Sequence, residues 1–403
     1  MKTWQVSFAA GQASAPEIAF EDGQLSIALR FAMPEAKEAL RKRMEKPLTL
    51  SAAAQPGDRI DVSCSGARLA LYVNDRLADE EWPCGTCGFP KAVRGIPGFT
   101  VTDTPRTDAF PLRTVRGIQG FAPGNGVNVG DCMPMPDGEL LRIFYLYDRR
   151  HHGSKWSLGA PQGAQITTND LKTWTMQPMA VGIDDPSEGS ICTGSVIRDG
   201  DTWYAFYAIR ACDGSPARMT ASVSHDGVHF EKTHRAFALP EPYDAATARD
   251  PKVYREGDRF VMLVTTSYGA EGCLARLESP DLESWTLIGP ELLTQEHQPE
   301  CPDHFFFGGH EYLVFGRAGT THYRIRGGDG QWHAPAGEDV IVDSHLRVPK
   351  AAVWQGRLLF AGFVVLPDVP AWGGTMELWE GFADEQGSLR FEKLCTEAPA
   401  CAG

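Results

Sequence analysis

The chain has 403 residues, of which 42% are hydrophobic and 22% charged, a balance typical of a globular protein long enough for two domains. Its formal net charge of −14 disfavours nucleic acid and anionic membranes as partners, and no apolar run reaches the roughly 18 residues of a membrane span. The first residues lack a basic stretch followed by an apolar core, so we expect no signal peptide and a cytoplasmic location.

The first 112 residues predict a small β-rich domain that resembles part of a lectin-like sandwich. Runs rich in β-formers occupy residues 25–31, 47–53, 59–64 and 68–82. Residues 34–46 are highly charged and follow the pattern of a helix, with a proline in the first turn. A polar, proline-bearing linker at residues 103–114 separates this domain from residues 113–403.

The second region contains a repeat of the form Ser/Thr-x-Asp-Leu/Gly-x-x-Trp/Phe, which recurs about every 50 residues. Its copies lie at residues 168–174, 224–230 and 279–285, with weaker ones at 329–332 and 384–391. The Asp and Ser side chains can bond nearby backbone amides in a turn, and the aromatic residue can pack between neighbouring sheets. A strand-like run accompanies each copy, at residues 142–148, 202–209, 259–267, 311–316 and 357–365. Five such units predict a five-bladed β-propeller, with an irregular β-sandwich as the alternative.

Three acidic residues occupy similar places in these units. Asp131, Asp250 and Glu300 each precede the strand-like run of the first, third and fourth unit. The innermost strands of a propeller line a common funnel, so acids at these places should meet although they lie far apart in the chain. Glycoside hydrolysis requires a pair of carboxyl groups beside the scissile bond, and close carboxylates raise each other's pKa. The pattern therefore predicts an acidic catalytic site, against the alternative of three solvated surface acids.

Two strings around these acids resemble the signature motifs of a known family. Arg-Asp-Pro at residues 249–251 and Glu-Cys-Pro-Asp at residues 300–303 are similar to motifs of glycoside hydrolase family 32, the invertase and fructanase family. Residues 167–174, 190–208 and 371–378 resemble further segments of that family in the same order. The resemblance implies a propeller glycosidase that acts on a fructofuranoside or related furanoside with retention, through a covalent glycosyl-enzyme, and needs neither cofactor nor metal.

The resemblance also implies roles for individual residues. Asp131 would be the nucleophile, Asp250 would hold sugar hydroxyls in the transition state, and Glu300 would be the acid/base. Arg249 would bind the sugar and orient the carboxylates. Two further candidates for substrate binding are Thr193 and Ser195, which belong to the second-blade segment.

The first-blade motif departs from the family, because only Asp131 of the pattern W-M-N-D-P-N-G is kept. Residues 145–156 replace a second family segment and carry a basic run that begins at Arg149. This run either binds an acidic or differently shaped sugar or forms an exposed turn. Trp156, at its end, is our preferred candidate for stacking on a sugar ring.

Two other functions stay open. An inverting pentosidase, like the related five-bladed arabinanases and xylosidases of family 43, would use a comparable set of three acids. A carbohydrate-binding propeller with an eroded site would use none of them catalytically. In each case the expected partner is a glycoside or oligosaccharide. No metal site is predicted, because the one Cys-x-x-Cys pair, Cys84 and Cys87, has no second pair nearby.

Overall fold

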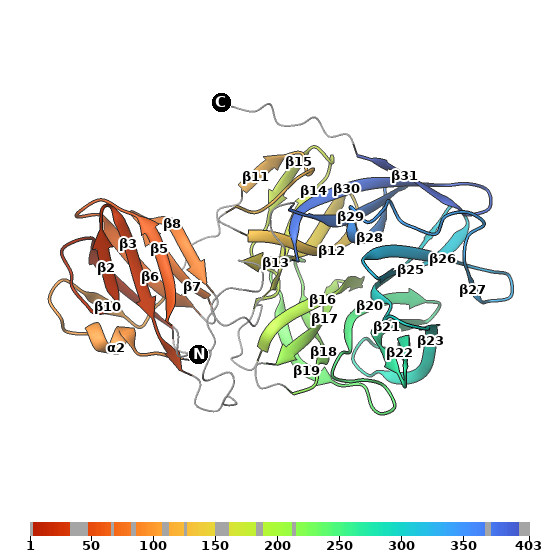
Figure 1. Cartoon of the computed structure of the whole chain (residues 1–403), viewed down its shortest axis with the longest axis horizontal. Coiled ribbons are helices and arrows are strands. Elements are labelled where there is room, and N and C mark those ends of the chain that lie inside the picture. Colours follow the sequence, from red (N-terminus) through yellow and green to blue (C-terminus); the bar gives the residue numbers. More distant parts are fainter. Residues whose placement is uncertain are drawn as a thin grey trace.

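The computed structural model describes residues 3–32, 47–65, 68–81, 86–106, 113–124, 127–149, 161–182, 188–211, 215–366 and 372–394. Regular structure in these ranges is almost entirely β, which confirms the predicted fold class (Figure 1). Helix α2 (Phe89–Val93) is the one helix within them. No helix in these ranges is long and apolar enough to cross a membrane.

The N-terminal strands form a separate group, coloured red to orange in Figure 1. They are β1 (Trp4–Ala9), β2 (Ile18–Glu21), β3 (Gln24–Leu29), β4 (Phe31–Ala32), β5 (Leu48–Ala53), β6 (Arg59–Ser65), β7 (Arg68–Val73), β8 (Arg76–Glu81), β9 (Thr86–Cys87) and β10 (Thr100–Thr102). A five-stranded sheet has the order β10-β1-β6-β7-β8, a three-stranded sheet has the order β2-β3-β5, and β4 pairs with β9. Alternate residues of β1 and β3 are buried, as a sheet with one face on a core requires.

A single cluster of buried apolar side chains, running from Trp4 to Val93, joins these N-terminal sheets. This core of their own supports the predicted boundary near residue 112, which stays a prediction. One contact to the next region is made by the Tyr147 hydroxyl, which donates to Glu80 Oε1 at 2.8 Å. The predicted helix at residues 34–46 lies outside the described residues, as do residues 107–112 of the predicted linker.

The second region contains the strands β11 (Arg113–Arg116), β12 (Val127–Asp137), β13 (Leu140–Arg149), β14 (Gln162–Thr168), β15 (Thr173–Met176), β16 (Glu188–Asp199), β17 (Thr202–Ala211), β18 (Arg218–Ser224), β19 (Glu231–Phe237), β20 (Arg249–Glu256), β21 (Arg259–Tyr268), β22 (Glu271–Ser279), β23 (Thr286–Thr294), β24 (Glu300–Phe307), β25 (His310–Arg317), β26 (Thr320–Arg326), β27 (Trp332–His333), β28 (Arg347–Trp354), β29 (Arg357–Val365), β30 (Gly374–Ala383) and β31 (Leu389–Lys393). From β12 onward they pair consecutively and antiparallel in groups of four, each group being one meander. The strand-like runs predicted from the sequence are the second strands of these meanders.

The first strands of the meanders form a closed ring. β12 contacts β16, β16 contacts β20, β20 contacts β24, β24 contacts β28, and β28 contacts β12. The first and fifth meanders are joined where Val129 of β12 pairs with Gly374 of β30, and where Phe121 forms a β-bridge with Met376. This is the arrangement of a propeller, with five meanders around a common axis and their innermost strands at the centre (Figure 1).

The repeated motif forms the predicted turn between the third and fourth strands of a meander. In its first copy Asp170 Oδ1 accepts from the amides of Lys172 and Thr173 at 2.8 and 2.7 Å. The hydroxyl of Thr168 accepts from the amides of Asp170 and Leu171 at 3.2 and 3.0 Å. Asp226 and Asp281 bond the backbone in the same way in the next two copies. The side chains therefore fix the turn locally, as the pattern predicts.

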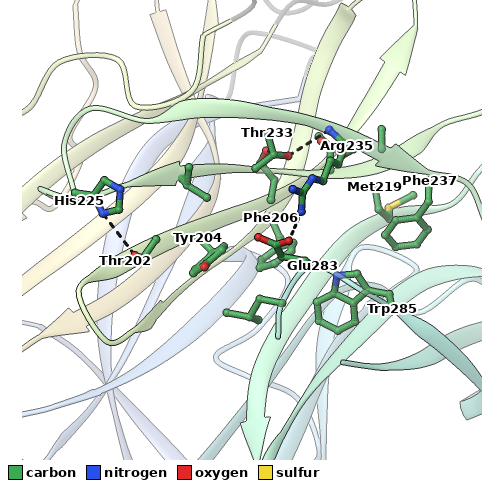
Figure 2. Close-up of a pocket in the computed structure, with 15 residues that line it drawn as sticks. Thr202, Tyr204, Phe206, Met219, His225, Thr233, Arg235, Phe237, Glu283 and Trp285 are labelled. Carbon is green, nitrogen blue, oxygen red and sulfur yellow. Dashed lines mark hydrogen bonds and ion pairs between the residues drawn. The ribbon is translucent and has the colours of Figure 1, made fainter. Parts of the chain in front are cut away.

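The aromatic residue after each of these turns packs against the preceding meander. Phe230 meets Phe144 edge-on at 5.7 Å between ring centroids, and Trp285 meets Phe206 in the same way at the same distance. Near Trp285 the two meanders leave a groove of about 540 Å³, which Figure 2 shows between β17–β19 and the turn before β23. An ion pair between Arg235 and Glu283 spans this groove.

Replacement of Trp285 by alanine should therefore loosen the contact between the second and third meanders. We expect Trp285→Ala to lower the free energy of unfolding by about 3 kcal/mol, because it removes a large ring from an interface between sheets. Chemical denaturation with fluorescence or circular dichroism measures this change. Ile288→Ala is the matched control, since Ile288 in β23 is 56% exposed and should cost little. Equal losses in the two variants would contradict an interface role for Trp285.

Candidate active site

All five innermost strands carry a β-bulge at the same level. In each, two residues face a single residue of the second strand, and these pairs are Gly130 with Asp131, Cys192 with Thr193, Asp250 with Pro251, Cys301 with Pro302, and Val348 with Pro349. A bulge re-aims side chains and locally ends regular pairing, and proline is tolerated there because no ladder amide is needed. Because the innermost strands contact each other in a ring, the bulge residues of the five strands also form a ring.

The predicted acids all lie at this ring, inside the innermost strands that precede the strand-like runs. Asp250 and Cys301 are first bulge residues and adopt positive φ angles of 57° and 48°. Asp131 is a second bulge residue, and Glu300 immediately precedes its bulge. Positive φ is uncommon for residues other than glycine and is often found at functional sites.

Asp131 and Asp250 are both buried, at 6% and 4% exposure, and the side chain of Cys301 lies between them. The Cys301 sulfur is 3.5 Å from Asp131 Oδ2 and 3.5 Å from Asp250 Oδ2. The amide of Cys301 also donates to Asp250 Oδ2 at 3.0 Å. Two carboxyl groups from the first and third meanders thus share one thiol from the fourth, which confirms that the funnel brings them together.

Burial raises the pKa of Asp131 to about 7, and the neighbouring Asp250 carboxylate adds to the rise. The ammonium of Lys350, the thiol of Cys301 and the hydroxyl of Thr193 act in the opposite direction. Within the described residues, Asp131 Oδ1 and the Thr193 hydroxyl have no hydrogen-bond partner of normal geometry. One oxygen of a buried carboxyl group is therefore uncommitted.

Glu300 lies at a more open place, with its side chain 48% exposed. Arg249 donates to Glu300 Oε1 at 2.6 Å, and its Nε lies 3.6 Å from Asp250 Oδ2. Arg249 is itself held by Gln298 Oε1 at 2.5 Å and by the Thr247 carbonyl at 2.8 Å. Its guanidinium therefore links the exposed acid to the buried pair, as the expected orienting role requires.

The other predicted binding residues differ in what they contact. Thr193 is 1% exposed and faces Asp131. Ser195 is buried between meanders, where it donates to the Pro251 carbonyl at 2.9 Å and accepts from the Val253 amide at 2.8 Å. Both of its hydrogen-bonding functions thus join β16 to β20. Trp156 lies outside the described residues, and so does the side chain of Arg149.

A second tryptophan, which the sequence analysis did not single out, lies next to the residue that precedes Asp131. Trp372 packs so closely on Gly130 that a Cβ added to Gly130 would come within 2.0 Å of the indole. Trp372 also meets Phe363 edge-on at 5.4 Å. Because Gly130 directly precedes Asp131, this ring packs on the backbone that carries Asp131. The signal in the sequence was the family-like segment at residues 371–378.

Two lysines, the partly buried Lys252 and the buried Lys350, lie one residue beyond the bulges. Lys252 Nζ is 2.5 Å from Asp303 Oδ1, while Asp303 Oδ2 accepts from the Ala351 amide at 2.5 Å. Lys350, at 2% exposure, donates to the Gly194 carbonyl at 2.7 Å. Neither lysine was predicted as a site residue. A signal existed, because Arg-Val-Pro-Lys at residues 347–350 repeats Arg-Asp-Pro-Lys at residues 249–252 with one change.

A comparison with protein families matches residues 134–333 to the model described as "Glycosyl hydrolases family 32 N-terminal domain". The matched range includes Asp250 and Glu300 and begins just after Asp131. Among curated proteins, a probable sucrose-6-phosphate hydrolase of Psychromonas ingrahamii is 29% identical over 259 residues, which cover 61% of this chain and 45% of that protein. The sucrose-6-phosphate hydrolase of Escherichia coli is 25% identical, over 60% of this chain and 57% of its own. The chain spans about half the length of the curated relatives it matches.

Solved structures show the same fold. A GH32 beta-fructofuranosidase of Bombyx mori superposes with a TM-score of 0.57 at 19% identity, over 70% of this chain and 65% of that one. Fructan 1-exohydrolase IIa of Cichorium intybus superposes with a TM-score of 0.58 at 16% identity, over 72% and 62%. The family match over residues 134–333 and the two signature strings at one ring of the propeller support a divergent member of glycoside hydrolase family 32.

Proposed function

We propose that the protein hydrolyses a fructofuranoside or a related furanoside with retention of configuration. The observation that supports this most is the convergence of the two signature strings with Asp131. Asp131 and Asp250 share the thiol of Cys301, and Arg249 joins Asp250 to Glu300. A site of this kind offers a buried nucleophile and a more exposed proton donor, the pair that retaining glycosidases use.

In the proposed reaction Asp131 attacks the anomeric carbon while Glu300 protonates the departing oxygen. Asp131 Oδ1 is suited to attack, because it has no hydrogen-bond partner of normal geometry among the described residues. Glu300, with its half-exposed side chain, then takes a proton from the water that releases the sugar. Asp250, fixed by the Cys301 amide, would hold sugar hydroxyls, and Arg249 would orient Glu300.

The substrate class is a proposal as well. Curated relatives are named for sucrose-6-phosphate, and the solved relatives for fructofuranosides and fructans. The basic run that starts at Arg149 would suit a phosphorylated or otherwise acidic sugar, although its side chains lie outside the described residues. A cytoplasmic location would agree with such a substrate and stays a prediction.

A substrate screen with a matched variant tests the proposal. Wild type and Glu300→Ala are assayed on sucrose-6-phosphate, sucrose, fructans, arabinans and chromogenic furanosides. We expect hydrolysis of at least one fructofuranoside by the wild type, and a loss on the order of 100-fold or more in Glu300→Ala, because general acid catalysis is removed. A chromogenic substrate with a good leaving group should lose less, since it needs little protonation. Equal activity of both proteins on every substrate would refute the assignment.

The inverting pentosidase is the second candidate, favoured by the altered first-blade sequence around Asp131. Proton NMR of the first product formed distinguishes the two functions. Retention supports Asp131 as a nucleophile, whereas inversion would make it a base that activates water. If no glycoside is hydrolysed but oligosaccharides still bind, the chain is a carbohydrate-binding propeller.

A further inference from the structure

The buried lysine of the fifth meander suggests a role that neither family motif assigns. We propose that Lys350 is a positioning residue of the acid site, whose ammonium, held on the Gly194 carbonyl, favours the ionised form of Asp131 that attack requires. The inference rests on the proposed function for its kinetic consequence. Its electrostatic part concerns only the folded protein and can be measured without any substrate.

The path of the Lys350 side chain places its charge beside Asp131. Lys350 leaves β28 one residue after the bulge and donates to the carbonyl of Gly194 in β16. In the ring of innermost strands β12 contacts both β28 and β16. A side chain that joins β28 to β16 therefore crosses the ring at β12, the strand that carries Asp131.

The charge of Lys350 has no direct counter-ion. No carboxylate of the described residues lies within 4.0 Å of its ammonium, in contrast to Lys252, which is paired with Asp303. A buried ammonium is costly unless negative charge nearby compensates it. Once Lys252 and Asp303 offset each other, the carboxyl groups left at the ring are Asp131, Asp250 and Glu300. Arg249 pairs with Glu300 and lies beside Asp250. The unpaired charge of Lys350 is therefore available to the buried acid pair.

Several groups besides Lys350 face Asp131 and shift its pKa. Asp250 from β20 raises the pKa of Asp131, while the thiol of Cys301 from β24 and the hydroxyl of Thr193 from β16 lower it. The thiol of Cys132, the next residue along β12, has its own pKa raised by burial and by Asp131, so it stays neutral. Lys350 is thus the full positive charge among these groups, and the other cation beside the acid pair is Arg249, whose Nε lies 3.6 Å from Asp250 Oδ2.

Three replacements separate the charge of Lys350 from its hydrogen bond. Lys350→Met removes both, Lys350→Gln keeps an N–H donor for Gly194 without the charge, and Lys350→Arg keeps the charge. The full chain is labelled with ¹³C at the aspartate carboxyl carbons, and the Asp131 signal is assigned from its loss in Asp131→Asn. We expect the titration midpoint of Asp131 to rise by about one pH unit or more in the Met and Gln variants, and to stay near wild type in Arg.

Kinetics give the second readout. The acidic limb of kcat/KM should move to higher pH with the same two variants, so that activity at pH 6 falls about tenfold while the high-pH plateau is largely kept. Lys232→Met is the matched control, because Lys232 is also a buried lysine but pairs with Glu188 in the second meander. That variant should lose stability without moving the Asp131 midpoint.

The outcomes are distinguishable. An unmoved midpoint in folded Lys350→Gln would overturn the inference, as would an equal rise in Lys232→Met. If the Met variant does not fold, the Gln variant decides. If the midpoint rises but wild type hydrolyses no glycoside, the electrostatic role of Lys350 stands and the proposed function fails. If wild type is active and the midpoint does not move, the proposed function stands and Lys350 has no part in it.

Discussion

Replacement of Asp131 by asparagine is expected to abolish hydrolysis and at the same time to stabilise the protein at alkaline pH. Loss of the proposed nucleophile should reduce kcat by a factor on the order of 10⁴ or more. The stability effect follows from the burial of Asp131, whose pKa is raised from 3.8 to about 7. The ionised side chain is therefore less favourable in the folded protein than in the unfolded chain, and asparagine cannot ionise.

The sign of the pH dependence is fixed by the direction of that shift. Between pH 4 and 7 the folded protein holds a proton on Asp131 that the unfolded chain has lost, so the free energy of unfolding falls as pH rises through this range. Relative to wild type, Asp131→Asn should gain roughly 2–3 kcal/mol between pH 5 and pH 8. Urea denaturation at pH 5, 6, 7 and 8 measures the difference. If the free energies of unfolding of the two proteins change with pH in parallel, Asp131 is not a buried carboxyl group with a raised pKa.

Gly130→Ala is the second replacement for which we expect a large effect. The added Cβ would lie 2.0 Å from Trp372 Cη2, much closer than any real contact, so the indole or the bulge must move. Overpacking of this kind typically costs about 1–3 kcal/mol. Because Gly130 adjoins Asp131, we also expect kcat/KM to fall by about 100-fold, since small displacements of a catalytic group have effects of that size.

Two further variants test this explanation. Gly337→Ala is a control, because a Cβ there meets no atom within 4 Å. Trp372→Ala should lower stability by itself, yet in combination with Gly130→Ala it removes the clash. The double variant should then be more stable than the sum of the single losses predicts. Additive losses would show that the strain at Gly130 does not come from the indole.

The architecture could be predicted from the sequence, because turns and strands each have a recognisable local sequence pattern. The three good copies of the turn motif mark positions in successive meanders, and their side chains make the bonds that the pattern implies. The acids were assigned to the correct meanders for the same reason. The bounds of the innermost strands around them were not predicted, because a bulge breaks the alternation of buried and exposed residues by which such a strand is recognised.

The remaining parts of the site depend on contacts between distant meanders. Cys301 belongs to a recognised string, yet its position between Asp131 and Asp250 depends on three strands meeting. Lys350 would have been found only by noticing that the fifth meander repeats the third with valine in place of aspartate. The sequence favoured Trp156 because it ends a basic run, and the place of Trp372 against Gly130 could not be predicted because it depends on the first and last meanders meeting.

The pairing of β12 with β30, which closes the ring, has a consequence for how the proposed activity arises during synthesis. Val129 lies two residues from Asp131 and pairs with Gly374 in the last meander. Residues up to β30 must therefore be synthesised before β12, the strand that carries Asp131, can pair with β30. Fragments that end before β30 would hold all three acids and still lack an assembled site. Recovery of enzymatic turnover after dilution from denaturant should accordingly lag behind the recovery of β-structure, and would report the joining of the two ends of the propeller.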